Sequence, residues 1–397
     1  MQKSEMNEVF LVAGVRTAIG TFGGALKDHT PTALAASVTS EVVKRASLDP
    51  EQVGNVVFGQ VIPTEPKDAY LARVAAIESG LPHAVPAMTL NRLCGSGLQA
   101  VVSAAQSIML GDAEVAVAGG AECMSRAPFL APATRWGSRM GDSVLVDTLL
   151  GALTDPFNKI LMGVTAENVA ERYGVTRAEQ DALALLSQQR AKLAIKEGRF
   201  TSQILPIECS ARGKTTLFQQ DEHVRDDVSH EELAALRTIF RKDGTVTAGN
   251  ASGINDGAAA VMLASASAVR KYHLQPMARL VAYGHAGVDP AYMGIGPVPA
   301  TRLALQRCGL SVDDLDVIES NEAFAAQACA VAKELKFDSE KLNPNGSGIS
   351  LGHPVGATGA INTVKLVYEL QRIRGRYGLV TMCIGGGQGI SAIFERV

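Results

Sequence analysis

The sequence predicts an α/β protein. Short apolar runs typical of buried strands alternate with longer segments typical of amphipathic helices, which is the pattern of sheets covered by helices. The composition, with 47% hydrophobic residues and 39 glycines, suits a compact fold with many tight turns. A chain of 397 residues has room for two or three domains and a sizeable core.

The first α/β unit is expected to span residues 1–123. Thr30 and Pro31 are of the residue types that favour an N-cap and the first helical position. The expected elements are a strand at 9–14, a helix from 31 to about 48, a strand at 55–62, helices at 69–80 and 97–110, and a strand at 114–120.

Residues 124–246 are expected to be an inserted region, because prolines and irregular stretches replace the regular pattern. One helix is well marked there: Thr176-Arg177-Ala178-Glu179 has the capping-box pattern, and Gly198 lies just beyond the expected end. Residues 247–275 then rejoin residues 1–123 in one half of the protein, with a strand expected at 258–264.

Residues 276–397 are expected to form a second half that repeats the first. Its expected strands are at 278–283, 316–319, 378–384 and 390–395. Helices are expected at 299–308, after residue 324 up to about residue 335, and after residue 359 up to about residue 374. Val57 and Cys94 are separated by nearly the same length as Ile318 and His353, and a strand ending in glycines follows each pair. We interpret this as an internal duplication in which each copy presents a reactive turn.

Charge and cysteine usage exclude several classes of protein. A net charge of -3 gives no electrostatic reason to expect nucleic acid or an anionic membrane as a partner.

No apolar run approaches the roughly 20 residues of a transmembrane helix. The start, with Lys3, Glu5 and Glu8, resembles neither a signal peptide nor a transit peptide, so a cytoplasmic location is expected. Six dispersed cysteines without a C-x-x-C pair argue against disulfides and a metal site.

A candidate nucleophile lies in the stretch Asn91-Arg92-Leu93-Cys94-Gly95-Ser96-Gly97, directly before an apolar helix. Unpaired N–H groups and the positive end of the helix dipole favour a thiolate or a developing oxyanion there. We expect Gly95 and Gly97 to leave room for a substrate near the backbone. Cysteine is also a common buried apolar residue, so this stretch alone leaves both interpretations open.

Three further motifs supply possible partners for the thiol. Gly352-His353-Pro354 offers a histidine that accepts a proton near neutral pH, although a structural loop histidine has the same pattern. Cys383 precedes Ile384-Gly385-Gly386-Gly387, whose glycines indicate an open backbone with free N–H donors. Asn321, in Asn321-Glu322-Ala323-Phe324, is expected either to cap a helix or to orient a water molecule.

Together, in this order and spacing, these four motifs resemble the thiolase family over essentially the whole chain. The resemblance is closest to bacterial biosynthetic acetyl-CoA acetyltransferases and β-ketothiolases. It implies a thiolase fold, with a five-layered αβαβα core of two similar halves and residues 124–246 as a loop domain over the active site. It also implies a homotetramer, built as a dimer of dimers through the inserted region.

The resemblance also implies the roles of the site residues. Cys94 would attack an acyl thioester and carry the acyl group, His353 would activate it, and Cys383 would move the proton at the α-carbon of acetyl-CoA. Asn321 would hold a water that forms one oxyanion hole with His353, and the N–H groups of Cys94 and Gly385 would form the other. Coenzyme A and its thioesters would be substrates, with no cofactor or metal.

Ligand contacts follow from the same resemblance. Arg225 would meet the nucleotide end of CoA, and Ala248 and Ser252 its pantetheine arm. The acyl pocket would be lined by Leu153, Met162, Met293, Ala323 and Phe324. The sequence departs from the acetoacetyl-specific pattern at Leu161, where histidine is usual, and at Glu232, where a CoA-contacting serine is common.

The implied activity is a reversible Claisen condensation of acetyl-CoA with an acyl-CoA, and thiolysis of short-chain 3-ketoacyl-CoA. Leu161 would admit longer chains, or else be neutral in an enzyme specific for acetoacetyl-CoA. Polyhydroxyalkanoate synthesis and fatty-acid breakdown are both compatible pathways. Two remoter alternatives are a ketoacyl synthase, which pairs its cysteine with two histidines, and a non-catalytic CoA or lipid binder, which would have lost part of the four motifs.

Overall fold

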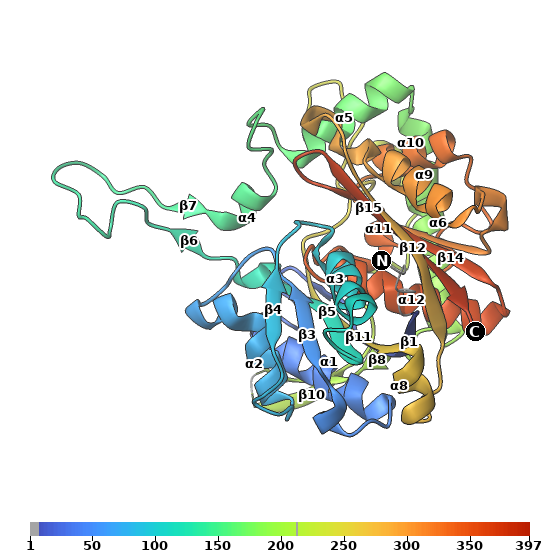
Figure 1. Ribbon diagram of the computed structural model, residues 1–397. Coiled ribbons are helices and arrows are strands. Elements are labelled where there is room, and N and C mark those ends of the chain that lie inside the picture. The colour runs from blue at the N-terminus through green and yellow to red at the C-terminus, as the bar shows by residue number, and fades with distance from the viewer. Residues whose placement is uncertain (1–7, 212) are drawn as a thin grey trace, which may run out of the picture.

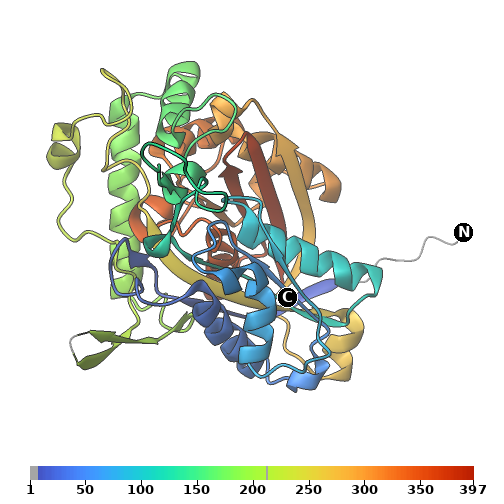
Figure 2. The same cartoon turned by 90° about the vertical axis from the view of Figure 1, so that its left-hand side faces the viewer.

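The computed structural model describes residues 8–211 and 213–397 (Figures 1 and 2). The N-terminal segment on which the targeting prediction depends lies mostly outside these residues. One continuous set of paired strands runs through the molecule in the order β13-β14-β15-β12-β1-β11-β5-β3-β4. The strands are β1 (Val9–Thr17), β3 (Asn55–Gly59), β4 (Ala87–Leu90), β5 (Val115–Cys123), β11 (Asn255–Ser265), β12 (Ala278–Gly287), β13 (Val317–Ser320), β14 (Tyr377–Ile384) and β15 (Gln388–Arg396). Short β2 (Gly20–Thr21) and β8 (Ile204–Leu205) pair with β11 and β1.

The strand order repeats, as the internal duplication predicts. In the first half β3 runs parallel to β5, β5 antiparallel to β11, and β11 antiparallel to β1. In the second half β13 runs parallel to β14, β14 antiparallel to β15, and β15 antiparallel to β12. The halves join where β1 pairs with β12 over only two positions, Phe10 with Arg279 and Leu11 with Ala278. Each half therefore forms its own sheet layer.

Helices complete the five layers that the resemblance implies (Figures 1 and 2). Between the two sheets lie α3 (Ser96–Leu110) and α12 (Thr358–Ile373), whose apolar side chains share one core cluster with both sheets. The outer face of the first sheet is covered by α1 (Pro31–Arg45) and α2 (Leu71–Glu78), and that of the second by α9 (Pro297–Cys308), with α10 (Ala325–Leu335) beside it. Alternate residues of one strand face different layers: Ala116 and Ala118 pack in the central cluster, Val115 and Val117 in the outer one.

The central position of α3 explains its composition. The window Leu93–Leu110 has a mean hydropathy of 1.3 over 18 residues, which by length and composition alone would suffice to cross a membrane. The sequence prediction overlooked this window. Since 61% of it is buried inside the molecule, between two sheets, its apolar character is that of a core helix.

Several element ends have identifiable causes. The Thr30 hydroxyl accepts from the Ala33 N–H at 3.2 Å at the start of α1, and the predicted capping box of Thr176 and Glu179 begins α6 (Arg177–Lys196). The strand predicted at 55–62 ends at Gly59. The Gln60 N–H still donates to the Leu90 carbonyl of β4, but the N–H groups of Val61 and Ile62 donate to a buried carboxylate instead of a strand. Asn321 caps no helix, since α10 begins four residues later at Ala325.

The region 124–246 contains more regular structure than the sequence predicted. Besides α6 it holds α4 (Thr148–Ala152), α5 (Met162–Tyr173), α7 (His230–Ala235), and the hairpin of β9 (Ile207–Ala211) and β10 (Lys214–Phe218). The segment with β6 (Phe129–Leu130) and β7 (Val146–Asp147) extends away from the body of the molecule as an arm (Figure 1). The remaining elements are α8 (Ala266–Lys271), α11 (Gly348–Leu351) and the 3₁₀ turns Pro50–Gln52, Pro66–Tyr70, Met124–Arg126, Pro290–Ile295 and Val312–Asp314.

Candidate active site

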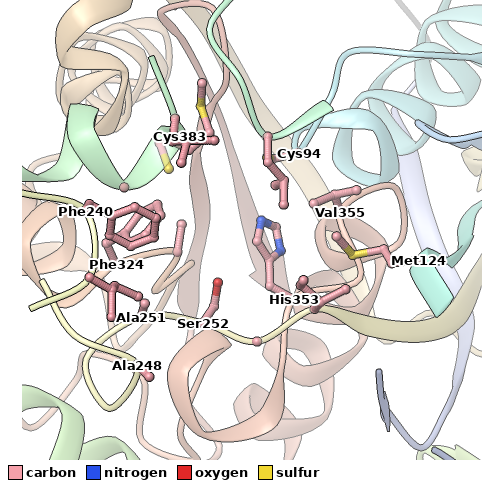
Figure 3. A pocket seen from close by; sticks show the side chains of 18 of the residues that line it. Cys94, Met124, Phe240, Ala248, Ala251, Ser252, Phe324, His353, Val355 and Cys383 are labelled. Carbon is pink, nitrogen blue, oxygen red and sulfur yellow. The ribbon is translucent and has the colours of Figure 1, made fainter. Parts of the chain in front are cut away.

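A cavity of about 430 Å³ collects the predicted reactive side chains from both halves. Cys94 enters it from the turn between β4 and α3, His353 from the loop between α11 and α12, and Cys383 from β14. Figure 3 shows these three side chains around the same space. Neither thiol forms a disulfide, since all six cysteines of the chain are free.

The Cys94 turn is held by its own side chains. The Asn91 carboxamide oxygen accepts from the Leu93 N–H at 2.8 Å, and the Ser96 hydroxyl accepts from the Arg92 N–H at 2.8 Å while it donates to the Leu93 carbonyl. These bonds keep Leu93 at a φ of 46°, a left-handed conformation that non-glycine residues rarely adopt. The strain places Cys94 just before the Gly95 N-cap of α3.

Gly95 and Gly97 serve packing rather than substrate access, contrary to the sequence prediction. A Cβ on Gly95 would lie 2.5 Å from the Ile384 side chain, and one on Gly97 would lie 2.6 Å from the Ala360 backbone nitrogen. Both contacts come from the second half of the chain. The glycines therefore let the two reactive turns approach each other.

Burial keeps the Cys94 thiol protonated. Desolvation raises its pKa to about 11, although the N–H groups of Gly385 and of Cys94 itself stabilise the thiolate, and the charge of Glu122 raises the pKa further. The two N–H groups that point at the sulfur are those predicted to form an oxyanion hole. A helix N-terminus alone does not make this cysteine a resting thiolate.

His353 is fixed as a neutral base by a chain of hydrogen bonds. The Thr358 hydroxyl lies 2.6 Å from His353 Nδ1 and donates its own proton to the Pro354 carbonyl at 2.9 Å. Because the Thr358 proton is already donated to Pro354, the hydroxyl oxygen can only accept a hydrogen bond from His353 Nδ1. Nδ1 therefore carries the hydrogen, and the lone pair is on Nε2. Burial lowers the pKa of His353 to about 4, so the ring is neutral near pH 7.

Asn321 and Cys383 complete the arrangement. The carboxamide nitrogen of Asn321 lies 3.3 Å from His353 Nε2, and its Oδ1 is buried without a hydrogen-bond partner among the described residues. Cys383 is 1% exposed, and both burial and the neighbouring charge of Cys94 raise the pKa of its thiol. Gly386 and Gly387, at φ values of 80° and 82°, turn the chain directly after Gly385.

The structure brings almost all predicted site residues together. Twelve of them line the cavity, namely Cys94, Leu153, Leu161, Met162, Arg225, Ala248, Ser252, Met293, Ala323, Phe324, His353 and Cys383. Asn321 and Gly385 lie behind this lining, the first against His353 and the second beside the Cys94 sulfur. Glu232 does not line the cavity, because it caps α7 in a capping box with Ser229.

The sequence analysis missed other lining residues. They are Met124, Leu150, Gly163, His223, Ile239, Phe240, Ala251, Gly253, Ile254 and Val355. Val355 directly follows the motif Gly352-His353-Pro354, so its position carried a signal. Phe240 carried none: its ring packs so closely on Gly163 that a Cβ there would lie 2.3 Å away, and it meets Phe324 edge to face.

A loop from the first half closes one wall of the cavity. The Ser252 N–H donates to the Ala323 carbonyl at 2.9 Å, and the Ala325 N–H donates to the Asn250 carbonyl at 2.8 Å. These bonds tie residues 247–253 to the segment after Asn321. At the mouth, burial and the charge of Arg225 lower the pKa of His223 to about 4. The residues that line the cavity are mostly apolar, and Arg225, which is exposed, adds a positive charge to the lining.

Comparison with known proteins agrees with this geometry. Two family models match the chain, the thiolase N-terminal domain over residues 9–267 and the thiolase C-terminal domain over residues 274–396. The chain is 63% identical to a protein named beta-ketothiolase BktB from Cupriavidus necator, over 98% of this chain and 99% of that one. It is 51% identical to an acetyl-CoA acetyltransferase from Pseudomonas aeruginosa, over 98% and 100% of the two chains.

Solved structures give the same result. The acetyl-CoA acetyltransferase of Bacillus anthracis superposes with a TM-score of 0.97 at 48% identity over the full length of both chains. Human mitochondrial 3-ketoacyl-CoA thiolase in complex with CoA superposes with a TM-score of 0.96 at 45% identity over 99% of each chain. With both family models, near-complete coverage and the same fold, this chain belongs to the thiolase family.

Proposed function

We propose that this thiolase condenses acetyl-CoA with an acyl-CoA and, in reverse, cleaves short-chain 3-ketoacyl-CoA with CoA, through an acyl group on Cys94. The observation that carries the proposal is the convergence of two thiols and one neutral imidazole on a single apolar cavity. Relatives named β-ketothiolase and acetyl-CoA acetyltransferase support it.

In the first step Cys94 Sγ attacks the thioester carbonyl carbon while its proton moves to His353 Nε2. The carbonyl oxygen becomes an oxyanion that the N–H groups of Cys94 and Gly385 stabilise; one such donor is worth roughly 2.7–4 kcal/mol. The bond to the CoA sulfur then breaks, and His353 returns the proton to the departing CoA thiolate. The acyl group remains on Cys94 as a thioester.

In the second step Cys383 removes a proton from the α-carbon of acetyl-CoA, after passing its own proton to His353. Burial disfavours the Cys383 thiolate, which makes it a stronger base toward a weakly acidic carbon. A water held by Asn321 and the protonated His353 would donate to the enolate oxygen. The carbanion attacks the acyl carbon, the bond to Cys94 breaks, and the Cys94 thiolate recovers the proton held by His353.

The substrate range follows from the cavity wall. Leu161, Met162, Met293 and Phe324 give an apolar surface that favours acyl chains longer than acetyl. Arg225 at the mouth would pair with a CoA phosphate, and Ala248 and Ser252 would flank the pantetheine arm. The alternative is an enzyme restricted to acetoacetyl-CoA, in which Leu161 is a neutral change.

Thiolysis of acetoacetyl-, 3-ketovaleryl- and 3-ketohexanoyl-CoA, compared by kcat/KM, tests the proposal. Comparable cleavage of all three supports a broad β-ketothiolase. Cleavage confined to acetoacetyl-CoA supports the restricted alternative. If the enzyme cleaves none of them, the proposed activity is wrong and the chain is a CoA or lipid binder.

We propose in addition that residues 124–246 act as a loop domain whose arm pairs dimers into a tetramer. Several of its apolar side chains are largely exposed in the single chain: Phe129 is 60%, Trp136 89% and Met140 94% exposed. Light scattering tests this: a tetramer that Trp136→Ser and Met140→Ser reduce to a dimer agrees with it, and an unchanged tetramer does not. We also propose a cytoplasmic location and a reaction without a cofactor.

A further inference from the structure

One buried carboxylate that takes no part in the proposed chemistry lies between the two reactive turns. Glu122, near the end of β5, is 0% exposed. Its oxygens accept three backbone hydrogen bonds, and among the described residues it forms no ion pair with a lysine or arginine. A buried acid without a cation is costly, so its position calls for an explanation.

The first two bonds hold a loop under the cysteine turn. The N–H groups of Val61 and Ile62 donate to Glu122 at 2.9 and 3.1 Å. Val61 and Ile62 belong to a small apolar cluster against which Leu93 and Cys94 pack. The Asn91 carboxamide also donates to the Val61 carbonyl at 3.2 Å. The carboxylate therefore fixes the support on which the nucleophile rests.

The third bond reaches the histidine loop of the other half. The Gly356 N–H donates to Glu122 Oε2 at 2.9 Å, three residues after His353. Val355, between them, packs in the same apolar cluster as Val61 and Ile62. A Cβ on Gly356 would lie 2.4 Å from Oε2 of Glu122, so only glycine permits this approach. One carboxylate thus ties together the supports of Cys94 and His353.

The charge of Glu122 also acts on the thiol. It raises the pKa of Cys94, in addition to the effect of burial. Burial raises the pKa of Glu122 itself to about 8, against the effect of its three N–H donors. Above that pH the carboxylate is charged, which is the range in which Cys94 ionises. The other titratable groups around this pair are Asp68, Cys123, His353 and Cys383.

We propose that Glu122 is a positioning residue that holds the Cys94 turn and the His353 loop at a fixed separation across the two halves. The kinetic part of this inference rests on the proposed thiolase activity. The effect of Glu122 on the pKa of Cys94 does not depend on that activity.

Two substitutions separate position from charge. Glu122→Gln keeps the shape but removes the charge and turns an amide group toward the N–H donors. Glu122→Asp keeps the charge but shortens the reach to Val61, Ile62 and Gly356. We expect both to lower kcat for acetoacetyl-CoA thiolysis by about ten- to a hundredfold, because a small misplacement of reacting groups is costly. KM should change much less, since Glu122 does not line the cavity.

The pH dependence of Cys94 alkylation by iodoacetamide gives a second readout. Glu122→Gln should move the alkylation midpoint to lower pH, whereas Glu122→Asp should leave it near that of the wild type. Glu167→Gln is the matched control, because Glu167 is a buried carboxylate that accepts the N–H groups of Thr245 and Val246 but does not act on the Cys94 pKa. It should leave the midpoint unchanged.

The outcomes separate this inference from the proposed function. If the wild type cleaves acetoacetyl-CoA and both Glu122 variants retain its kcat, Glu122 does not position the turns. A reduced kcat with the alkylation midpoint of Glu122→Gln at the wild-type value, or above it, also overturns the inference. If Glu122→Gln does not fold, Glu122→Asp still decides the kinetic question. A wild type without thiolysis contradicts the proposed function, and the alkylation profiles then test the Glu122 contact alone.

Discussion

The Cys94 turn and the segments that carry Asn321, His353 and Cys383 come from the two repeated halves, but water reaches them differently. Cys94 as a residue is partly exposed at the cavity, although its thiol is desolvated, whereas Asn321 is 0%, His353 5% and Cys383 1% exposed. A nucleophile must meet a thioester that arrives from solvent. Groups that hold or move protons gain from burial, because desolvation sets which protonation state they rest in. The two halves thus have similar backbones, but their reactive side chains differ in exposure and in their roles.

The two regions are also held differently. Asn91 and Ser96, from the same turn, fix the strained backbone before Cys94. His353 is fixed both by its own loop and by the other half: Thr358, five residues on, accepts its ring N–H, and Asn255 accepts its backbone N–H at 2.8 Å. We therefore expect a substitution in the Cys94 turn to disturb mainly that turn. A substitution near His353 should also change the positions of the other groups that move protons.

The largest expected effect comes from removal of the nucleophile. Cys94→Ala should lower the kcat of thiolysis by about four orders of magnitude or more, because no acyl-enzyme forms. Steady-state assays and intact-protein mass spectrometry after exposure to acetyl-CoA measure both consequences. Turnover within about tenfold of the wild type would show that the acyl group is carried elsewhere.

Removal of the Thr358 hydroxyl should have the next largest effect. Thr358→Val deletes the acceptor for Nδ1–H of His353, so the ring can rotate or change tautomer. We expect kcat to fall by about ten- to a hundredfold with little change in KM. Thr358→Ser keeps the hydroxyl and should recover most of the activity. Equal losses in the two variants would mean that packing, not the hydrogen bond, is responsible.

The acid limb of the pH profile tests the burial of His353. Because its pKa is lowered to about 4, the base stays neutral as pH falls below 6.5 and is lost only as pH approaches 4. The folded state should also lose stability from pH 6.5 down to about 4, since the unfolded imidazole binds a proton more readily. Initial rates must therefore be measured before unfolding. A kcat/KM that halves near pH 6.5 contradicts this account of the site.

The smallest expected effect concerns the cavity wall. Leu161→His places a polar group where an apolar side chain lines the cavity. We expect the ratio of 3-ketohexanoyl-CoA to acetoacetyl-CoA cleavage to fall by about tenfold or less, as for single changes in apolar pockets. Leu161→Met is the control that keeps the wall apolar. A ratio that does not change would make residue 161 neutral.

The sequence predicted those features of the fold and the site that depend on a few neighbouring residues. Caps at Thr30 and Thr176, and glycines after the strands, are signals that a few neighbouring residues supply. Residues 124–246 were harder. The helix α5 begins at Met162 without a side-chain cap, so no start signal marks it.

Long-range contacts account for the remaining errors. Gly95 and Gly97 were predicted to leave room for a substrate. The atoms that lie close to them belong instead to Ile384 and Ala360 in the other half. Phe240 enters the cavity only because Gly163, far away in sequence, leaves room for it. Glu122 carried no signal in a strand of small residues. Such contacts depend on how the halves pack, which one strand or turn does not specify.

The most direct test of the division between nucleophile and proton-moving groups is mass spectrometry of Cys383→Ala after exposure to acetyl-CoA, together with its condensation rate. We expect an acetyl group on Cys94 at wild-type occupancy and no detectable acetoacetyl-CoA, because the nucleophile at the cavity is intact and the buried base is missing. Normal condensation by this variant, or the absence of an acetyl group on Cys94, would contradict the account.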